Sequence, residues 1–185
     1  MTAARTTSLM EAFAAHAEIA DPLHRFAEAL MRGPSPFTPA EREAIAVRVS
    51  TANGCVFCRD AHGAAAKALG LEDLDALIGD TPPARLAPVL AFVDKLNRTP
   101  DAVTEADRRA VLDAGFDETA LHHAALVCGF FNLMNRWVEG LGYPSAPELT
   151  RAAGRMLARD GYAALVNPPS RGGRGRPTDA SGGRP

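Results

Sequence analysis

Apolar residues recur every three to four positions along most of the chain, between short groups of Gly, Pro, Ser, Thr, Asn and Asp. This spacing is typical of amphipathic helices, whereas a half-buried strand alternates apolar and polar residues with a period of two. No stretch of five or more residues alternates convincingly, apart from a short ambiguous run at residues 47–50. The pattern predicts an all-α fold, a helical bundle in a single domain.

Capping and helix-breaking residues place the ends of the expected helices. The sequence TPAE at residues 38–41 is a capping box with proline at the first helical position, so a helix is expected from there to about residue 52. Asn53 and Gly54 interrupt it, and a new helix begins around Cys55 and ends at Gly70. The other expected helices cover residues 7–17, 21–31 (opened by Pro22), 71–78, 81–99 (opened by Thr81 and Pro82), 104–115, 117–142 and 145–160 (capped by Ser145).

These helices indicate three segments: N-terminal helices in residues 1–34, a helical core in residues 35–166 and a tail in residues 167–185. The tail is rich in Gly, Pro and Arg, and it has no apolar periodicity that would let it bury surface. Such a segment is expected to be disordered. A single short arginine- and glycine-rich tail is weak support for RNA binding, and the formal net charge of −2 adds none, so no nucleic-acid partner is expected.

The chain is expected to be cytoplasmic. No apolar run approaches the roughly 18 residues needed to cross a bilayer, and the N-terminus lacks the features of a signal peptide. Three cysteines are too few, and odd in number, for a disulfide scaffold. A close pair in such a chain is typical of a metal-binding or catalytic site.

The pair is Cys55 and Cys58, and His62 follows four residues later. Positions i, i+3 and i+7 share one face of a helix, so the two thiols are expected close enough to form a disulfide. His62 is expected one turn from Cys58, within reach of a direct or water-mediated hydrogen bond. Glu43 lies on the preceding helix in one stripe with Val47, where an inward carboxylate would accept a proton or orient the imidazole.

The start of a helix favours a thiolate, because its free N–H groups and dipole stabilise negative charge. Arg59 is adjacent to Cys58 and is expected to add to this effect. A thiolate attacks peroxides and disulfides, and a second cysteine three residues away resolves the resulting sulfenic acid. The segment therefore favours redox chemistry.

Other interpretations of the pair stay open at this point. Zinc would need a fourth ligand, which His122, His123 or a water molecule would supply. A thioredoxin-like motif follows a strand in a βαβ unit, and none is predicted. Haem attachment requires a histidine directly after the second cysteine, where this chain has Arg59. A purely structural pair is the remaining alternative.

The spacing E-x11-C-x2-C-x3-H, from Glu43 to His62, resembles the alkylhydroperoxidase D-like (AhpD-like) branch of the carboxymuconolactone decarboxylase superfamily. The stretch TPAEREAIAVRVSTANGCVFCRDAHGAAAKALG carries most of the likeness. The later HHAALVCGFFNLMNRWVEGLG resembles the peroxidase-related members, and the two stretches extend the resemblance over roughly residues 35–145. It implies an AhpD-like helical bundle, homo-oligomers that are often trimers or hexamers, and an antioxidant peroxidase that reduces hydroperoxides with thiols.

The resemblance also assigns roles. It implies that Cys58 is the peroxidatic thiol, Cys55 the resolving thiol, and Glu43 with His62 a proton relay. Some members have a histidine where this chain has Phe57. The electron donor implied is a lipoylated or thioredoxin-like protein, and no G-x-G-x-x-G fingerprint indicates a bound cofactor.

Two alternatives remain beside the peroxidase. One is a carboxymuconolactone decarboxylase-like lyase acting on a small carboxylated lactone, with His62 as acid and base and the thiols incidental. The other is a non-enzymatic redox or metal-binding protein. Elsewhere, Cys128 is expected in the core, and His16 and His24 on the surface. Three polar residues either line a pocket or subunit interface or make ordinary helix-end hydrogen bonds, namely Asn132, Asn135 and Arg136.

Overall fold

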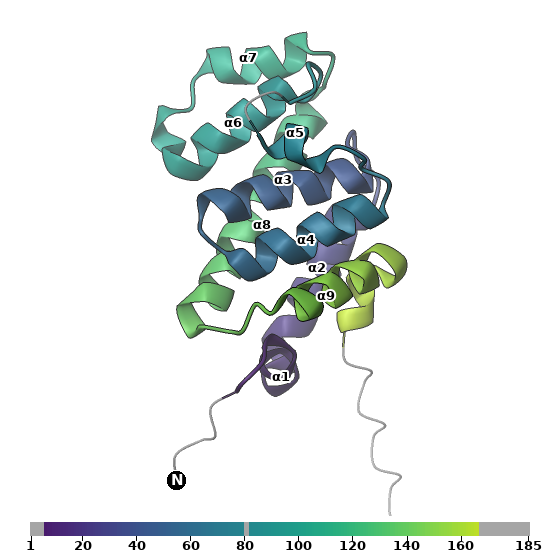
Figure 1. Cartoon of the computed structure of the whole chain (residues 1–185). Helices are drawn as coiled ribbons and strands as arrows, with labels where there is room; N and C mark the ends of the chain where they lie inside the picture. Colours follow the sequence, from purple (N-terminus) through teal and green to yellow (C-terminus); the bar gives the residue numbers. More distant parts are fainter. Residues whose placement is uncertain (1–5, 80–81, 167–185) are drawn as a thin grey trace, which may run out of the picture.

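The computed structural model describes residues 6–79 and 82–166 (Figure 1). Within these residues the chain forms α-helices and two short 3-10 helices and contains no strand, which confirms the all-α prediction. The expected tail at 167–185 lies outside the described residues. The helices are α1 (Leu9–Ala15), α2 (Ala17–Arg32), α3 (Pro39–Ala52), α4 (Val56–Ala68), α5 (Leu74–Ile78), α6 (Ala87–Arg98), α7 (Glu105–Asp113), α8 (Glu118–Leu141) and α9 (Pro147–Asp160), with η1 (Pro100–Ala102) and η2 (Ala163–Leu165).

The clearest capping signals are confirmed. Thr38 Oγ1 accepts the Glu41 N–H at 3.2 Å, and Glu41 Oε2 accepts the Thr38 N–H at 2.8 Å, so the capping box opens α3 as expected. The second helix of the central pair, α4, has Cys55 as its N-cap. At the other end of the longest helix, Gly142 has φ +66°, the left-handed conformation that glycine adopts without a steric penalty.

Several expected boundaries are wrong. Pro22 does not open α2, which begins at Ala17. Proline this near a helix start removes only one early backbone hydrogen bond, so the helix continues through it. The cap of α9 is Ala146 rather than Ser145, because Pro147 takes the first helical position. The helices α5 and α6 both begin later than expected, at Leu74 and Ala87.

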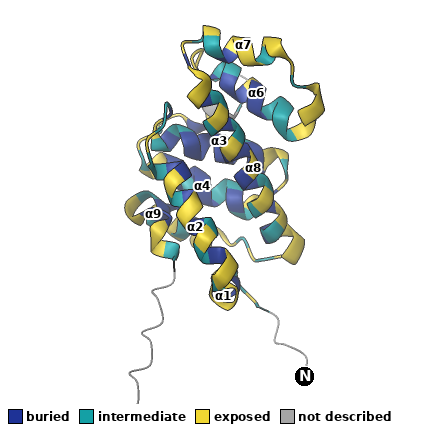
Figure 2. Ribbon diagram, turned by 180° about the vertical axis from the view of Figure 1, so that it is seen from behind, coloured by how far each residue is buried: buried dark blue, intermediate teal, exposed yellow. Residues whose placement is uncertain are grey.

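The central helix is α3, which is buried on nearly all sides and packs against α4, α6 and α8. Figure 2 shows α3 and α4 mostly buried, whereas α7 is largely exposed. A helix buried all round must give every charged side chain a partner. Arg42 Nη1 donates to the carbonyls of Leu30 (2.7 Å) and Gly33 (2.9 Å) at the end of α2, and Arg48 pairs with Asp94 of α6.

On its other side α4 packs against α9, so α4 lies between α3 and α9 (Figure 1). The two helices approach closely at Gly154. A Cβ added there would overlap the carbonyl oxygen of Ala61 and lie 2.6 Å from Ala64 Cβ. Glycine at this position therefore sets the separation of α9 from the helix that carries the thiols. Among the described residues no helix combines the length and hydropathy needed to cross a bilayer.

Gly154→Ala is expected to destabilise the protein by about 3 kcal/mol, because backbone atoms of α4 cannot make room for the added methyl group. Gly129→Ala in α8 is the matched control. Nothing lies within 4 Å of its added Cβ, and alanine has the higher helix propensity, so the control should be neutral or slightly stabilising. Urea unfolding followed by circular dichroism measures both. Equal effects of the two substitutions would contradict the close packing.

Candidate active site

The two cysteines lie at the turn between α3 and α4. Gly54, with φ +73°, makes the turn, and the Cys55 N–H then donates to the Ser50 carbonyl at 2.9 Å. Cys55 is the N-cap of α4, and its Sγ accepts the Cys58 N–H at 3.4 Å. Both thiols are free and buried, with 0% of Cys55 and 3% of Cys58 exposed. The predicted placement of a thiol pair at a helix start is therefore found.

The two thiols differ in their tendency to ionise. The Cys58 side chain donates a hydrogen bond to Cys55, which lowers the pKa of Cys55, and the Cys58 backbone N–H acts in the same direction. The same hydrogen bond, together with burial, raises the pKa of Cys58 far above its ordinary value, although Asn135 opposes this. Cys55 is therefore the thiol of the pair that ionises more readily. The expected help from Arg59 is not seen, because its guanidinium pairs with Asp60 at 2.7 Å.

Glu43 and His62 are brought together as the spacing predicts. Glu43 Oε2 lies 2.6 Å from His62 Nδ1, and the Glu43 carboxylate has no exposed surface. The ring of His62 is held edge-on against Phe131, with centroids 4.5 Å apart. This pairing fixes the imidazole orientation, because Nδ1 is committed to the carboxylate.

Two further residues complete the carboxylate's surroundings, and neither was predicted. Arg32, at the end of α2, donates to Glu43 Oε1 at 2.7 Å. The Tyr162 hydroxyl lies 3.1 Å from Glu43 Oε1 and 3.3 Å from His62 Nδ1, and its ring lies beneath the Arg32 guanidinium. The end of α2 carries a basic residue as helix ends often do, which is a weak signal. Tyr162 follows the last predicted helix, and no sequence pattern marks it.

The charges around Glu43 outweigh the cost of burying it. Burial raises the pKa of Glu43, but the interactions with His62 and Arg32 together bring it below its ordinary value. Burial and the neighbouring Glu43 carboxylate raise the pKa of Tyr162, so its hydroxyl keeps its proton and acts as a donor. The site therefore holds an ionised carboxylate away from water.

An apolar cavity of about 80 Å³ lies beside the Glu43–His62 pair. Cys58, His62 and Tyr162 all line it. Its other walls are apolar side chains of α1, α4, α8, α9 and η2. Phe57, which occupies the position where some relatives have a histidine, is one of them. His24 of α2 also lines the cavity and is 3% exposed, so the expected surface position of His24 is wrong. We call this space the apolar cavity.

A polar depression of about 420 Å³ lies beside the thiols, lined by Asn53, Asn135, Arg136, Glu139 and Gly140. Asn135 Nδ2 donates to Ser50 Oγ at 3.0 Å, and Glu139 Oε1 accepts the Val56 N–H at 3.1 Å. The expectation that Asn135 and Arg136 line a pocket is confirmed. Asn132 lies instead between α6 and α8, where it donates to Asn97 at 2.6 Å and to the Cys128 carbonyl at 2.9 Å.

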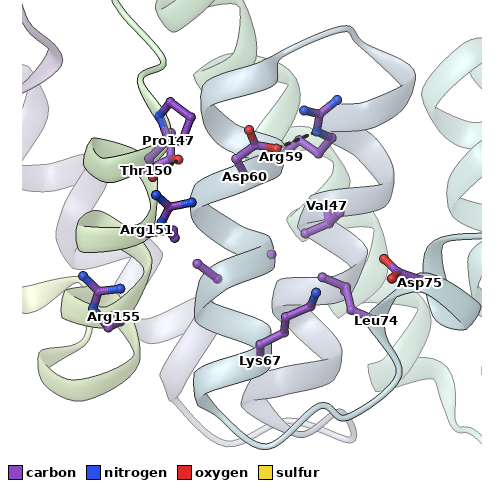
Figure 3. Close-up of a pocket in the computed structure, with 12 residues that line it drawn as sticks. Val47, Arg59, Asp60, Lys67, Leu74, Asp75, Pro147, Thr150, Arg151 and Arg155 are labelled. Atoms are coloured by element: carbon purple, nitrogen blue, oxygen red, sulfur yellow. Dashed lines mark hydrogen bonds and ion pairs between the residues drawn. The ribbon is translucent and has the colours of Figure 1, made fainter.

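A groove of about 500 Å³ lies on the outer side of α4 (Figure 3). Arg59, Asp60 and Lys67 of α4 face it, together with Arg151 and Arg155 of α9. No cysteine or histidine lines it, so it is not the site of thiol chemistry. In the described part of the chain, no three His, Cys, Asp or Glu side chains are grouped to hold a metal ion. Cys128 is buried and His16 is exposed, both as expected.

Glu43→Gln should destabilise the protein by roughly 3–5 kcal/mol near neutral pH, because it breaks a buried ion pair. The folded-state pKa of Glu43 is lowered, so its contribution is complete above about pH 4.5 and is lost as the pH falls through the folded pKa. The difference in unfolding free energy between parent and variant should therefore shrink below about pH 4.5. Urea unfolding from pH 3 to 8 measures it.

Glu105→Gln is the control for this series, because Glu105 is an exposed carboxylate paired with Arg108. It should change stability very little at any of these pH values. A gap between parent and Glu43→Gln that stays constant down to pH 3 would contradict the assignment of an ionised Glu43.

Comparison with known proteins places these residues in a family. The carboxymuconolactone decarboxylase family model matches residues 17–78, which contain Glu43, Cys55, Cys58 and His62. An uncharacterised peroxidase-related protein from Silicibacter sp. TM1040 is 31% identical, with 80% of each chain covered and a TM-score of 0.70. A peroxidase-related protein from Ralstonia eutropha JMP134, solved as an alkylhydroperoxidase AhpD core, is 30% identical, with 78% of each chain covered and a TM-score of 0.67. No curated protein matches the chain. The chain therefore belongs to the carboxymuconolactone decarboxylase family, in its AhpD-like, peroxidase-related branch.

Proposed function

We propose that this protein is a thiol-dependent peroxidase that reduces hydroperoxides through the Cys55–Cys58 pair. The observation that carries the proposal is that Cys58 shares the apolar cavity with His62, which is bound to a buried carboxylate. A nucleophile and an oriented proton donor then face one space, and the second thiol that resolves the nucleophile lies next to it, away from the cavity. The peroxidase-related names of the two similar structures support the same chemistry.

The attacking sulfur is Cys58, because it lines the cavity whereas Cys55 has no exposed surface. The hydrogen bond from Cys58 to the Cys55 thiolate supplies the route for its proton. As the proton moves to Cys55, the Cys58 sulfur attacks the terminal peroxide oxygen and the O–O bond breaks. Cys58 becomes a sulfenic acid, and the alkoxide that leaves takes a proton from His62.

Resolution follows from the same arrangement. Cys55 attacks the sulfur of the Cys58 sulfenic acid, its proton leaves with the hydroxyl group as water, and a Cys55–Cys58 disulfide forms. An external dithiol then attacks the disulfide. The dithiol is oxidised to its own disulfide, and Cys55 and Cys58 return to thiols. We propose a lipoylated or thioredoxin-like protein as this donor.

We also propose that the protein acts as a homo-oligomer, a trimer or a hexamer. Four large apolar side chains of the packed pair α2 and α8 are exposed by 42–56%, which supports burial of these surfaces between copies. They are Ile19, Phe26, Leu126 and Leu133.

Replacing the cysteines one at a time tests the assigned order. Cys58→Ser should reduce peroxide consumption, measured with dithiothreitol as donor, to the uncatalysed background. Without a donor, Cys55→Ser should consume at most one equivalent and stop, more slowly than the parent because Cys58 loses its proton acceptor, and leave the Cys58 sulfenic acid visible by mass spectrometry. Cys128→Ala is the control and should keep the parent rate, because Cys128 lies in the core contacting Asn132, and burial raises its pKa to about 11. Parent-like consumption by Cys58→Ser would overturn the proposal.

The relay is tested by a double-variant cycle. His62→Gln and Glu43→Gln should each lower kcat by about 100- to 10,000-fold, the range expected for loss of a positioned proton donor. Because Glu43 acts through His62, the double variant should be no slower than His62→Gln alone. Circular dichroism first establishes that each variant is folded. Losses that multiply in the double variant would show that the two residues act independently.

A further inference from the structure

Besides Tyr162, whose hydroxyl is bound to Glu43, the apolar cavity has one more polar side chain that the proposed cycle does not use. Only 3% of the surface of His24 is exposed, and its side chain lines the cavity from α2. Its ring packs edge-on against Phe13 of α1, with centroids 4.4 Å apart. Its Nδ1 atom has no hydrogen-bond partner among the described residues. A buried polar atom without a partner is costly, and a site that keeps one points to a ligand that satisfies it.

The protonation state of His24 defines what that ligand must offer. Burial lowers the pKa of His24, so the imidazole is neutral near pH 7. A neutral imidazole has one donor and one acceptor nitrogen. The unpartnered Nδ1 is one of these two, and a hydroxyl group, which can both donate and accept, satisfies it in either tautomer.

The rest of the cavity defines the ligand's other part. Its wall is nearly all carbon, and the side chains that surround the space include Phe13, Phe57, Phe130, Met134, Met156 and Leu165. Such a wall binds an alkyl or aryl group better than water or a charged group. Methionine side chains on two helices also adapt to the shape of an irregular apolar group.

We propose that the apolar cavity binds the organic group of the hydroperoxide and that His24 Nδ1 forms a hydrogen bond with a hydroxyl on that group. The inference rests on the proposed function, which makes the ligand a hydroperoxide, because Cys58 and His24 line the same cavity. The substrate class is a hydroperoxide whose apolar alkyl or aryl body carries a hydroxyl group. His24 is then a specificity residue and takes no part in the bond changes.

Binding of two unreactive alcohols tests the site without any peroxidase turnover. The probes are benzyl alcohol and 4-hydroxybenzyl alcohol, which differ only by a hydroxyl at the far end of the ring. NMR titration of the full chain should show the hydroxylated probe binding about tenfold tighter, the factor expected for one well-made hydrogen bond. In His24→Phe, which keeps an aromatic ring against Phe13, this preference should disappear while benzyl alcohol binds as in the parent.

His24→Gln is the second variant, because the glutamine amide keeps both a hydrogen-bond donor and an acceptor at this position. It should recover part of the preference for the hydroxylated probe, and it also tests the idea if His24→Phe does not fold. A preference that persists in His24→Phe, or failure of both probes to bind the parent, would overturn the inference. These outcomes are separate from the cysteine series, since peroxide consumption by the parent and its loss in Cys58→Ser do not depend on His24.

Discussion

The site depends on one buried charge, the carboxylate of Glu43. Its oxygens contact Arg32, His62 and Tyr162, so four segments of the chain meet at a single side chain. A carboxylate with no exposed surface persists only when its charge and its lone pairs are fully matched. Meeting this condition fixes the end of α2 and the segment after α9 relative to the α3–α4 pair. The geometry that holds His62 beside Cys58 is thus the same geometry that satisfies the buried charge.

The separation of the site residues along the sequence explains which of them could be predicted. Glu43, Cys55, Cys58 and His62 lie within twenty positions on two helices joined by a tight turn at Gly54, so helical periodicity alone brings them together. Tyr162 reaches the same carboxylate across 119 positions, and its place depends on how α9 packs against α4 at Gly154. Periodicity carries no information about such a contact. The expected surface position of His24 is wrong for the same reason. A histidine on a short amphipathic helix is expected to be exposed, but α1 and η2 cover this one.

The two cysteines lie in different environments, which their spacing in the sequence does not reveal. Cys55, as the N-cap, receives the hydrogen bonds that favour a thiolate, whereas Cys58 has access to the cavity. A lowered pKa and access to the cavity therefore belong to different sulfurs, which one hydrogen bond joins. The family resemblance assigned the attack to Cys58 without this division. In the proposed cycle the raised pKa of Cys58 is compatible with attack, because the neighbouring Cys55 accepts its proton.

The size of a cavity does not locate the chemistry in this fold. The groove in Figure 3 is about 500 Å³ and open to charged side chains, whereas the apolar cavity is about 80 Å³. One helix separates them: α4 presents Arg59 and Lys67 outward, and Cys58 and His62 inward. Charge interactions strengthen where water is excluded, so the small cavity is where Glu43 can orient an imidazole. In the proposed peroxidase the apolar wall therefore serves reactivity as well as substrate choice.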